Sequence, residues 1–344
     1  MQHIKRYIKI IYLLIFVVLI LFITQCVEKP TENVQSQASR TLTIQSETKS
    51  TISIAKPNIE WGIGVNPANG LTNPNPEDWD AAFKKASKLG KIAHLEVTHG
   101  EISLEDMFML LDLKVPLAKK YDMETFIQIN TFGKIPDPDE YRREAVEVAK
   151  KYKPDYLCLG QEINYVYDEN PKEEYQQFVK DLLITYQEVK KVSPNTKVFP
   201  SFAYEPMRAN KQEFLFNDFK DIPYFPMTSY PMSFLNLYSG NTYKSPKDIP
   251  SNYWNVSDIT DKDIFVTEIG WSTNAKWGSS RQKQSEFVYK ANEIINANPR
   301  VKKVVWITMM DVVDENTSDT YGYPGTMGFF TIDGKDKGNW GLIS

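Results

Sequence analysis

The feature that most constrains the fold is a regular alternation of short apolar runs and amphipathic stretches from residue 59 onward. The apolar runs are 59–65, 92–97, 125–130, 156–159, 197–202, 224–230, 264–267 and 304–310. Helix-like patterns between them cover 76–90, 104–120, 138–152, 173–192, 211–219 and 281–296. Eight such units in roughly 250 residues predict an α/β fold, the (β/α)8 TIM barrel. The competing doubly wound open sheet more often has six or fewer strands.

Two of the eight units deviate from this pattern. The run at 224–230 precedes a loop rich in Tyr and Asn, which leaves space for a short helix at most. After Asp311 comes a loop with several glycines and then the segment 328–335. We therefore expect the last helix of the barrel to be short or missing.

The N-terminal 26 residues have the pattern of a membrane-targeting segment. Residues 3–9 are basic and 10–24 are almost entirely Leu, Ile, Val and Phe, as in a signal peptide or a single spanning helix. Cys26, preceded by Gln25, ends the run, so either Cys26 is lipidated as in lipoproteins or the helix stays as an uncleaved anchor. Because the positive charges precede the apolar run, the rest of the chain is expected outside the cytoplasm, tethered to the cell membrane.

Residues 27–56 are rich in Ser, Thr, Gln, Glu and Lys and predict a flexible linker. Residues 57–344 then form one domain of the size that α/β barrels commonly reach, and we expect it to be monomeric. Only Cys158 remains in it, so an intradomain disulfide is impossible, and Cys158 is expected in the core. The formal net charge is −4 without a basic stripe, which argues against nucleic acid as a partner.

Two of the apolar runs end abruptly in a glutamate. Glu162 follows the fourth run and Glu268 ends the seventh. Strand ends and their loops build the active site of such barrels, and strands four and seven face each other across the mouth. Two facing glutamates suggest glycoside hydrolysis, with carboxyl groups about 5 Å apart in a retaining enzyme and about 6.5–9.5 Å apart in an inverting one.

At four places the residues resemble glycoside hydrolase clan A, a group of retaining (β/α)8 enzymes. Gly160-Gln161-Glu162 is similar to the clan's strand-four Gly-Asn-Glu, and 267–271 resembles the strand-seven signature of its endo-galactanase and endo-β-1,3-glucanase branches. Thr228-Ser229-Tyr230-Pro231 matches its strand-six tyrosine motif, and 328–335 resembles its C-terminal segment. The resemblance spans the whole domain, through short motifs.

The resemblance implies a role for each matched residue. Glu268 is the expected nucleophile and Glu162 the acid/base, while Tyr230 hydrogen-bonds the nucleophile. Gln161 stands where the clan has an asparagine that holds the sugar's 2-hydroxyl. Many clan members place an arginine near the nucleophile, and it is missing from the ends of the second and third runs. Either His99 or Asn130 substitutes for it, or the catalyst is weakened.

Aromatic residues are expected to stack on sugar rings. Trp271 and Trp306 are candidate substrate contacts, although core packing is an equal alternative for Trp306. A further set of aromatic residues predicts an open, aromatic-lined cleft: Tyr165, Tyr167, Phe234, Tyr238, Trp277 and Tyr323. His94 is expected to be structural, because on a strand it shares a face with Glu96 and not with His99. We expect no metal and no cofactor.

The sequence favours a glycoside hydrolase that acts on a β-linked poly- or oligosaccharide outside the cell. The alternative is a non-catalytic carbohydrate-binding surface lipoprotein on a degenerate barrel, a class that usually lacks a catalytic carboxylate, whereas both are present here. A phosphodiesterase on the same fold would need a histidine pair or a metal-ligand cluster, which the sequence does not offer.

Overall fold

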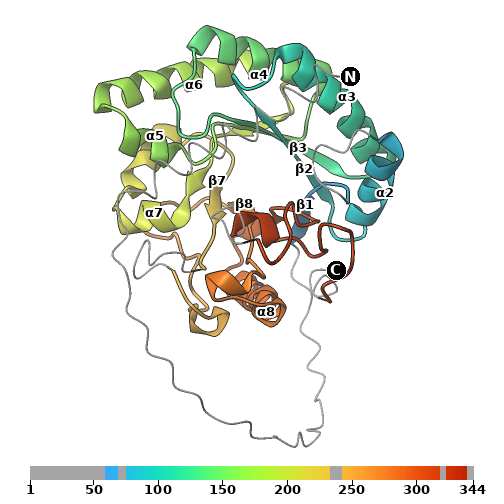
Figure 1. Cartoon of the computed structure of the whole chain (residues 1–344). Helices are drawn as coiled ribbons and strands as arrows, with labels where there is room; N and C mark the ends of the chain where they lie inside the picture. Colours follow the sequence, from blue (N-terminus) through green and yellow to red (C-terminus); the bar gives the residue numbers. More distant parts are fainter. Residues whose placement is uncertain (1–58, 69–74, 233–241, 318–322, 339–344) are drawn as a thin grey trace, which may run out of the picture. The chain divides into compact units, whose positions relative to one another are not determined.

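The computed structural model describes residues 59–68, 75–232, 242–317 and 323–338. Nine parallel strands run in the order β5-β4-β3-β2-β1-β9-β8-β7-β6 and curl into a ring (Figure 1). They are β1 (Glu60–Gly64), β2 (Ile92–Thr98), β3 (Glu124–Asn130), β4 (Tyr156–Leu159), β5 (Lys197–Phe199), β6 (Phe202–Ala203), β7 (Phe225–Ser229), β8 (Ile264–Ile269) and β9 (Val301–Trp306).

The nine strands occupy the eight positions of a TIM barrel. β5 pairs with β4 and β6 pairs with β7, and only Pro200 and Ser201 separate β5 from β6. Proline cannot donate to a strand ladder, which explains the interruption. The two segments therefore act as one fifth strand that joins the two ends of the sheet, and the predicted (β/α)8 fold is confirmed.

Helices surround the ring of strands (Figure 1). They are α2 (Pro76–Ala86), α3 (Leu104–Lys120), α4 (Pro138–Tyr152), α5 (Ile163–Glu169), α6 (Lys172–Val192), α7 (Tyr204–Ala209) and α8 (Arg281–Ala297). Side chains of Asn75, Ser103, Asp137 and Ser280 accept backbone N–H groups at the starts of α2, α3, α4 and α8. The short helices α5 and α7 were not expected from the sequence, and both follow strands that lead to the site.

Large aromatic side chains fill the interior of the barrel below its mouth. Phe126, Tyr156, Phe199 and Phe265 come from β3, β4, β5 and β8, and each is fully buried. The ring centroids of Phe126 and Phe265 lie 5.4 Å apart, and those of Tyr156 and Phe265 lie 5.2 Å apart. These contacts across the barrel show that its lower half is a packed core, so a ligand can enter only from the strands' carboxyl ends.

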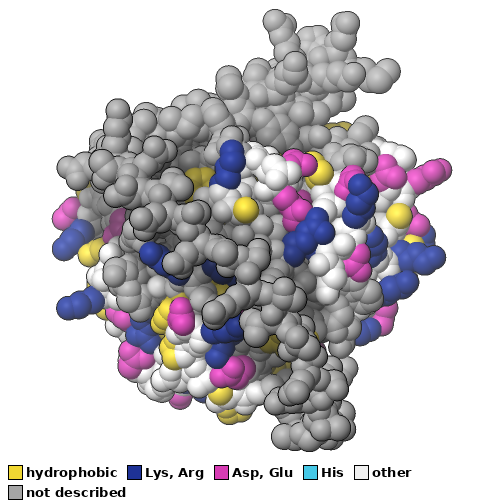
Figure 2. Space-filling view, turned by 60° about the horizontal axis from the view of Figure 1, so that its bottom comes forward, with side chains coloured by type: hydrophobic (Ala, Val, Ile, Leu, Met, Phe, Trp, Pro, Cys, Tyr) yellow, Lys and Arg dark blue, Asp and Glu magenta, His cyan; other side chains and the backbone are white. Residues whose placement is uncertain are grey.

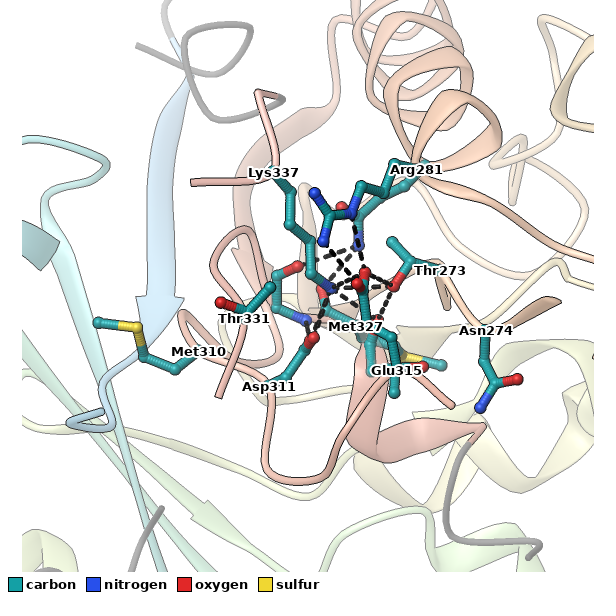
Figure 3. Close-up of polar contacts among 12 residues, drawn as sticks. Thr273, Asn274, Arg281, Met310, Asp311, Glu315, Met327, Thr331 and Lys337 are labelled. Carbon is teal, nitrogen blue, oxygen red and sulfur yellow. Dashed lines mark hydrogen bonds and ion pairs between the residues drawn. The ribbon is translucent and has the colours of Figure 1, made fainter. Parts of the chain in front are cut away.

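Instead of an eighth helix, a C-terminal segment closes the barrel. Among the described residues after β9, the only helical turn is the 3₁₀ helix Pro324–Thr326, as the prediction of a short or missing last helix requires. Lys337 and Asp311 form an ion pair at 2.6 Å, and both side chains are fully buried (Figure 3). Thr273 and Arg281 both donate to Glu315 beside this pair (Figure 3). The cluster thus ties this segment to the loops after β8 and β9.

On the described part of the face in Figure 2, basic and acidic side chains are interspersed. Among the residues that the structure describes, no helix combines the length and the apolar character needed to cross a bilayer. The predicted N-terminal segment, Cys26 and the linker to residue 56 lie outside the described residues.

Candidate active site

Glu162 lies in a strained turn where β4 leads into α5. Gly160 and Glu162 both have positive φ values, 87° and 52°. At Gly160 a side chain is excluded, because a Cβ would lie 2.8 Å from Ile163 Cγ2. Ser201 fixes the turn, since its Oγ accepts from the Glu162 backbone N–H at 3.1 Å and its carbonyl from the Ile163 N–H at 3.0 Å. Left-handed backbone at a non-glycine residue is strained and typical of functional sites.

Glu268 lies on β8 and is 2 % exposed. A register shift in the pairing of β7 with β8 places it opposite Thr228. Three side chains donate to its carboxylate: Gln128 at 2.7 Å and Gln161 at 2.8 Å to Oε1, and Tyr230 at 2.7 Å to Oε2. The contact of Tyr230 with Glu268 is the one that the strand-six motif predicted, whereas Gln161 was expected to hold a sugar hydroxyl and here donates to Glu268.

The two glutamates have unequal environments. Burial and then the charge of Glu268 raise the pKa of Glu162 to about 8, and the hydroxyl of Thr228, which donates to Glu162 Oε1 at 2.5 Å, only partly opposes this. Burial also raises the pKa of Glu268, but its three donors favour the charged form. Glu268 is therefore the better stabilised anion, and Glu162 is the residue that holds a proton near neutral pH.

A buried carboxylate behind the site holds the segment that carries Tyr230. Glu205, on α7, is 3 % exposed. It accepts from the Tyr230 backbone N–H at 3.0 Å, from the Ser229 hydroxyl at 2.7 Å and from the Tyr253 hydroxyl at 3.0 Å. Burial raises the pKa of Glu205 to about 6. These contacts fix the direction in which Tyr230 points.

Gln128, Thr228, Ser201 and Glu205 were not predicted as site residues, although Thr228 begins the strand-six motif. Gln128 had a usable signal, because it is a polar residue inside an apolar strand and shares a face with Asn130. The contacts of Ser201 and Glu205 join elements about 25 to 40 residues apart in the chain, and their spacing carries no recognisable motif.

Asn130 lies on the inner face of the barrel beside a third glutamate. Its Nδ2 donates to Glu96 Oε1. Glu96 pairs in register with Gln128, so it lies one strand away from a donor to Glu268. Among the described residues, amide and phenol groups donate to Glu268, and no arginine does. Asn130 was expected in place of the missing arginine, but it donates to Glu96, and the β3 residue that donates to Glu268 is Gln128.

His99 is not part of this cluster, and its expected substrate contact has to be corrected. Its Nδ1 lies 2.7 Å from Glu144 Oε2 on α4, and its ring packs edge-on against Tyr141 of the same helix. Residues 94, 96 and 98 alternate with it, so His99 points away from the barrel interior.

Trp271 and Trp306 are also core residues. Both are fully buried. The indole of Trp271 donates to Ser279 Oγ at 2.8 Å, and that of Trp306 donates to the Met327 carbonyl at 2.8 Å. Their rings pack against Phe287 of α8, on the outside of the sheet. The described conformation therefore does not place either tryptophan in contact with a sugar, and for Trp306 the core alternative holds.

Two of the expected cleft aromatics, Tyr167 and Tyr323, contact other groups of the protein in the described part of the chain. Tyr167 packs edge-on against Tyr175 and Phe214, and the Tyr323 hydroxyl donates to the Met232 carbonyl at 3.4 Å. Phe234 and Tyr238 lie outside the described residues.

A cavity of about 220 Å³ lies between α4 and α6, lined mainly by apolar side chains such as Ile135 and Leu182. It lies outside the barrel and includes neither Glu162 nor Glu268. The candidate site is therefore located by the carboxylates and hydrogen-bond donors that converge at the barrel mouth.

No protein-family model matches the chain, and no curated protein matches its sequence significantly. Solved structures do share its fold. One is a GH5_18 protein from Bifidobacterium longum in complex with Manβ1-4GlcNAc, with a TM-score of 0.62 and 13 % identity, covering 83 % of this chain and 77 % of that one.

Two further solved structures also share the fold of this chain. The GH53 catalytic domain from Ignisphaera aggregans has a TM-score of 0.53 and 15 % identity, covering 86 % of this chain and 98 % of that one. A β-glucuronidase from Ruminococcus gnavus has a TM-score of 0.59 and 10 % identity, covering 83 % of this chain and 49 % of that one. The chain is thus similar in fold to several glycoside hydrolases, in agreement with the resemblance to clan A found in its motifs.

Proposed function

We propose that the chain is a retaining glycoside hydrolase that cleaves β-linked oligo- or polysaccharides. The observation that carries this is the unequal pair at the barrel mouth. Glu268 is a buried carboxylate with three donors, whereas Glu162 is a partly buried carboxyl group whose pKa is raised to about 8. A double displacement needs one carboxylate that attacks and one carboxylic acid that protonates.

In the first step Glu268 attacks the anomeric carbon while Glu162 donates its proton to the leaving oxygen. Tyr230 and the two glutamines hold the Glu268 carboxylate in one orientation. The glycosyl ester that forms has no charge on Glu268, so the pKa of Glu162 falls. Glu162 then accepts a proton from the attacking water, and the ester bond to Glu268 breaks.

The N-terminal pattern supports an extracellular enzyme tethered to the membrane, either through lipidated Cys26 or through an uncleaved helix. The neighbouring structure with bound Manβ1-4GlcNAc supports a β-linked substrate. We propose that this protein acts as a monomer on sugars outside the cell, without metal, cofactor or nucleic acid.

The test uses 2,4-dinitrophenyl β-glycosides of glucose, galactose, mannose and N-acetylglucosamine, whose leaving group needs no protonation. We expect the wild type to release a sugar with retained anomeric configuration. The configuration of the released sugar is measured by ¹H NMR. Glu268→Gln should lose turnover more than 10³-fold. Glu162→Ala should keep the first step, and added azide should capture the intermediate as a β-glycosyl azide.

Glu124→Gln is the matched control, because Glu124 begins β3 at the opposite end of the barrel. An inverted product would exclude the retaining mechanism. Sugar binding by titration calorimetry without turnover of any probe would instead support the non-catalytic carbohydrate-binding alternative.

A further inference from the structure

A third carboxylate, Glu96, shares the barrel mouth with the two glutamates of the proposed mechanism. Glu96 lies on the inner face of β2, and its side chain is solvent-exposed. Burial and then the charge of Glu268 raise its pKa to about 7, with a smaller opposing effect from Lys114. Water reaches this side chain although protein surrounds its carboxyl group, so Glu96 and its neighbours form the floor of the barrel mouth.

The charges around Glu96 do not cancel. On β2 itself, the pKa of His94 is lowered to about 3 by burial, so His94 is neutral. β3 contributes uncharged amides, and β8 contributes Glu268. Glu101 adds a further negative charge from the loop after β2. The cation that acts on Glu96 is Lys114 of α3, which is 8 % exposed and lies 4.7 Å from the Trp79 ring centroid.

The hydrogen-bonding groups that remain available to a ligand on this floor are mainly acceptors, because the donors there already bind a carboxylate. Gln128, Gln161 and Tyr230 already donate to Glu268, and Asn130 donates to Glu96. Asn130 Oδ1 is buried without a hydrogen-bond partner among the described residues. A ligand that completes this floor has to bring donors, which are hydroxyl or ammonium groups. A ligand carboxylate would add a negative charge where negative charges already repel one another.

We propose that Glu96 is a specificity-determining residue that selects neutral or amino sugars and rejects uronic acids at this site. The inference rests on the proposed glycosidase function and narrows its substrate class. The fold leaves this choice open, because its neighbours include a complex with Manβ1-4GlcNAc and β-glucuronidases. The charges of this chain's own side chains decide it.

The experiment compares two probes in the wild type, Glu96→Gln and the control Glu124→Gln. The first probe is the neutral 2,4-dinitrophenyl β-glycoside that the wild type hydrolyses fastest. The second is the uronide of the same configuration, which carries a carboxylate at C6. We expect the wild type to prefer the neutral probe in kcat/KM, and Glu96→Gln to reduce this preference at least 10-fold. Melting temperature and circular dichroism establish that each variant is folded.

The pH dependence provides a readout that a purely structural role would not change. In the wild type, KM for the uronide should rise as pH passes through about 7, where Glu96 ionises, and this rise should be absent in Glu96→Gln. Preferred hydrolysis of the uronide, or an unchanged preference in Glu96→Gln, would overturn the inference while leaving the glycosidase function intact. Failure of the wild type on every neutral and acidic probe would refute the glycosidase function itself.

Discussion

Replacing Tyr230 with phenylalanine removes one hydroxyl from the candidate site and little else. The hydroxyl donates to Glu268 Oε2 at 2.7 Å, and the other two donors, Gln128 and Gln161, both bind Oε1. In Tyr230→Phe, Oε2 therefore loses the side-chain donor that the structure gives it. The backbone N–H of residue 230 still donates to Glu205, so the segment should keep its position.

The size of the effect follows from the chemistry of that bond. A hydrogen bond to a charged group contributes about 1.5–3 kcal/mol. Because the hydroxyl favours the ionised form of Glu268, its loss raises the pKa of Glu268. The nucleophile must be ionised, so the acidic limb of kcat/KM should move to higher pH. Activity at the optimum should fall about 10- to 100-fold.

The assay is kcat/KM against pH for the best 2,4-dinitrophenyl β-glycoside, measured for wild type and variant. Tyr156→Phe is a matched control, because the Tyr156 hydroxyl donates to Glu124 at 2.9 Å, near the start of β3. It should leave both limbs of the profile in place. An acidic limb that does not move in Tyr230→Phe would refute the argument that this hydroxyl stabilises the nucleophile's charge.

Three further predictions concern charges around the site and in the C-terminal closure. Glu205→Gln keeps an acceptor for the Tyr230 N–H but removes a negative charge that raises the pKa of Glu162. The basic limb of kcat/KM should therefore shift to lower pH, and an upward shift would contradict this. Lys337→Met leaves Asp311 buried without its cation and should lower the free energy of unfolding in urea by about 3–5 kcal/mol; a loss below ~1 kcal/mol would show that the pair is not needed. Burial acts to raise the pKa of Glu315, but the bonds from Arg281 and Thr273 outweigh it and lower that pKa to about 2. The stability this gives is present above pH about 4.5 and is lost as pH falls toward 2, so between these values the melting temperature should fall more steeply in wild type than in Glu315→Gln.

Much of the fold could be predicted because its signals are local. The alternation of apolar runs with amphipathic stretches predicts the barrel, and the segment after Asp311 lacks the pattern of a helix. The two glutamates could be placed at the mouth for the same reason, since parallel strands end at one edge of the barrel. Cap residues such as Asn75 and Ser103 also act within one turn of their own helix.

The direction of individual side chains could not be predicted in the same way. A shift of one residue in the inward alternation moves a side chain to the opposite face of the sheet. Thus His99 binds Glu144 on α4, and Trp271 and Trp306 pack toward α8. The register shift opposite Thr228 changes the alternation within β8, and only through it does Glu268 reach its donors.

The sequence alone therefore determined the architecture, the positions of Glu162 and Glu268 at strand ends, and the approach of Tyr230 to Glu268. The tertiary structure decided which other groups surround these carboxylates. Gln128, Thr228, Glu205 and Glu96 come from β3, β7, α7 and β2, and they meet only when the sheet closes. The physical reason is that periodicity is a property of neighbouring residues, whereas the pKa of a buried carboxylate depends on charges and donors brought together from across the barrel.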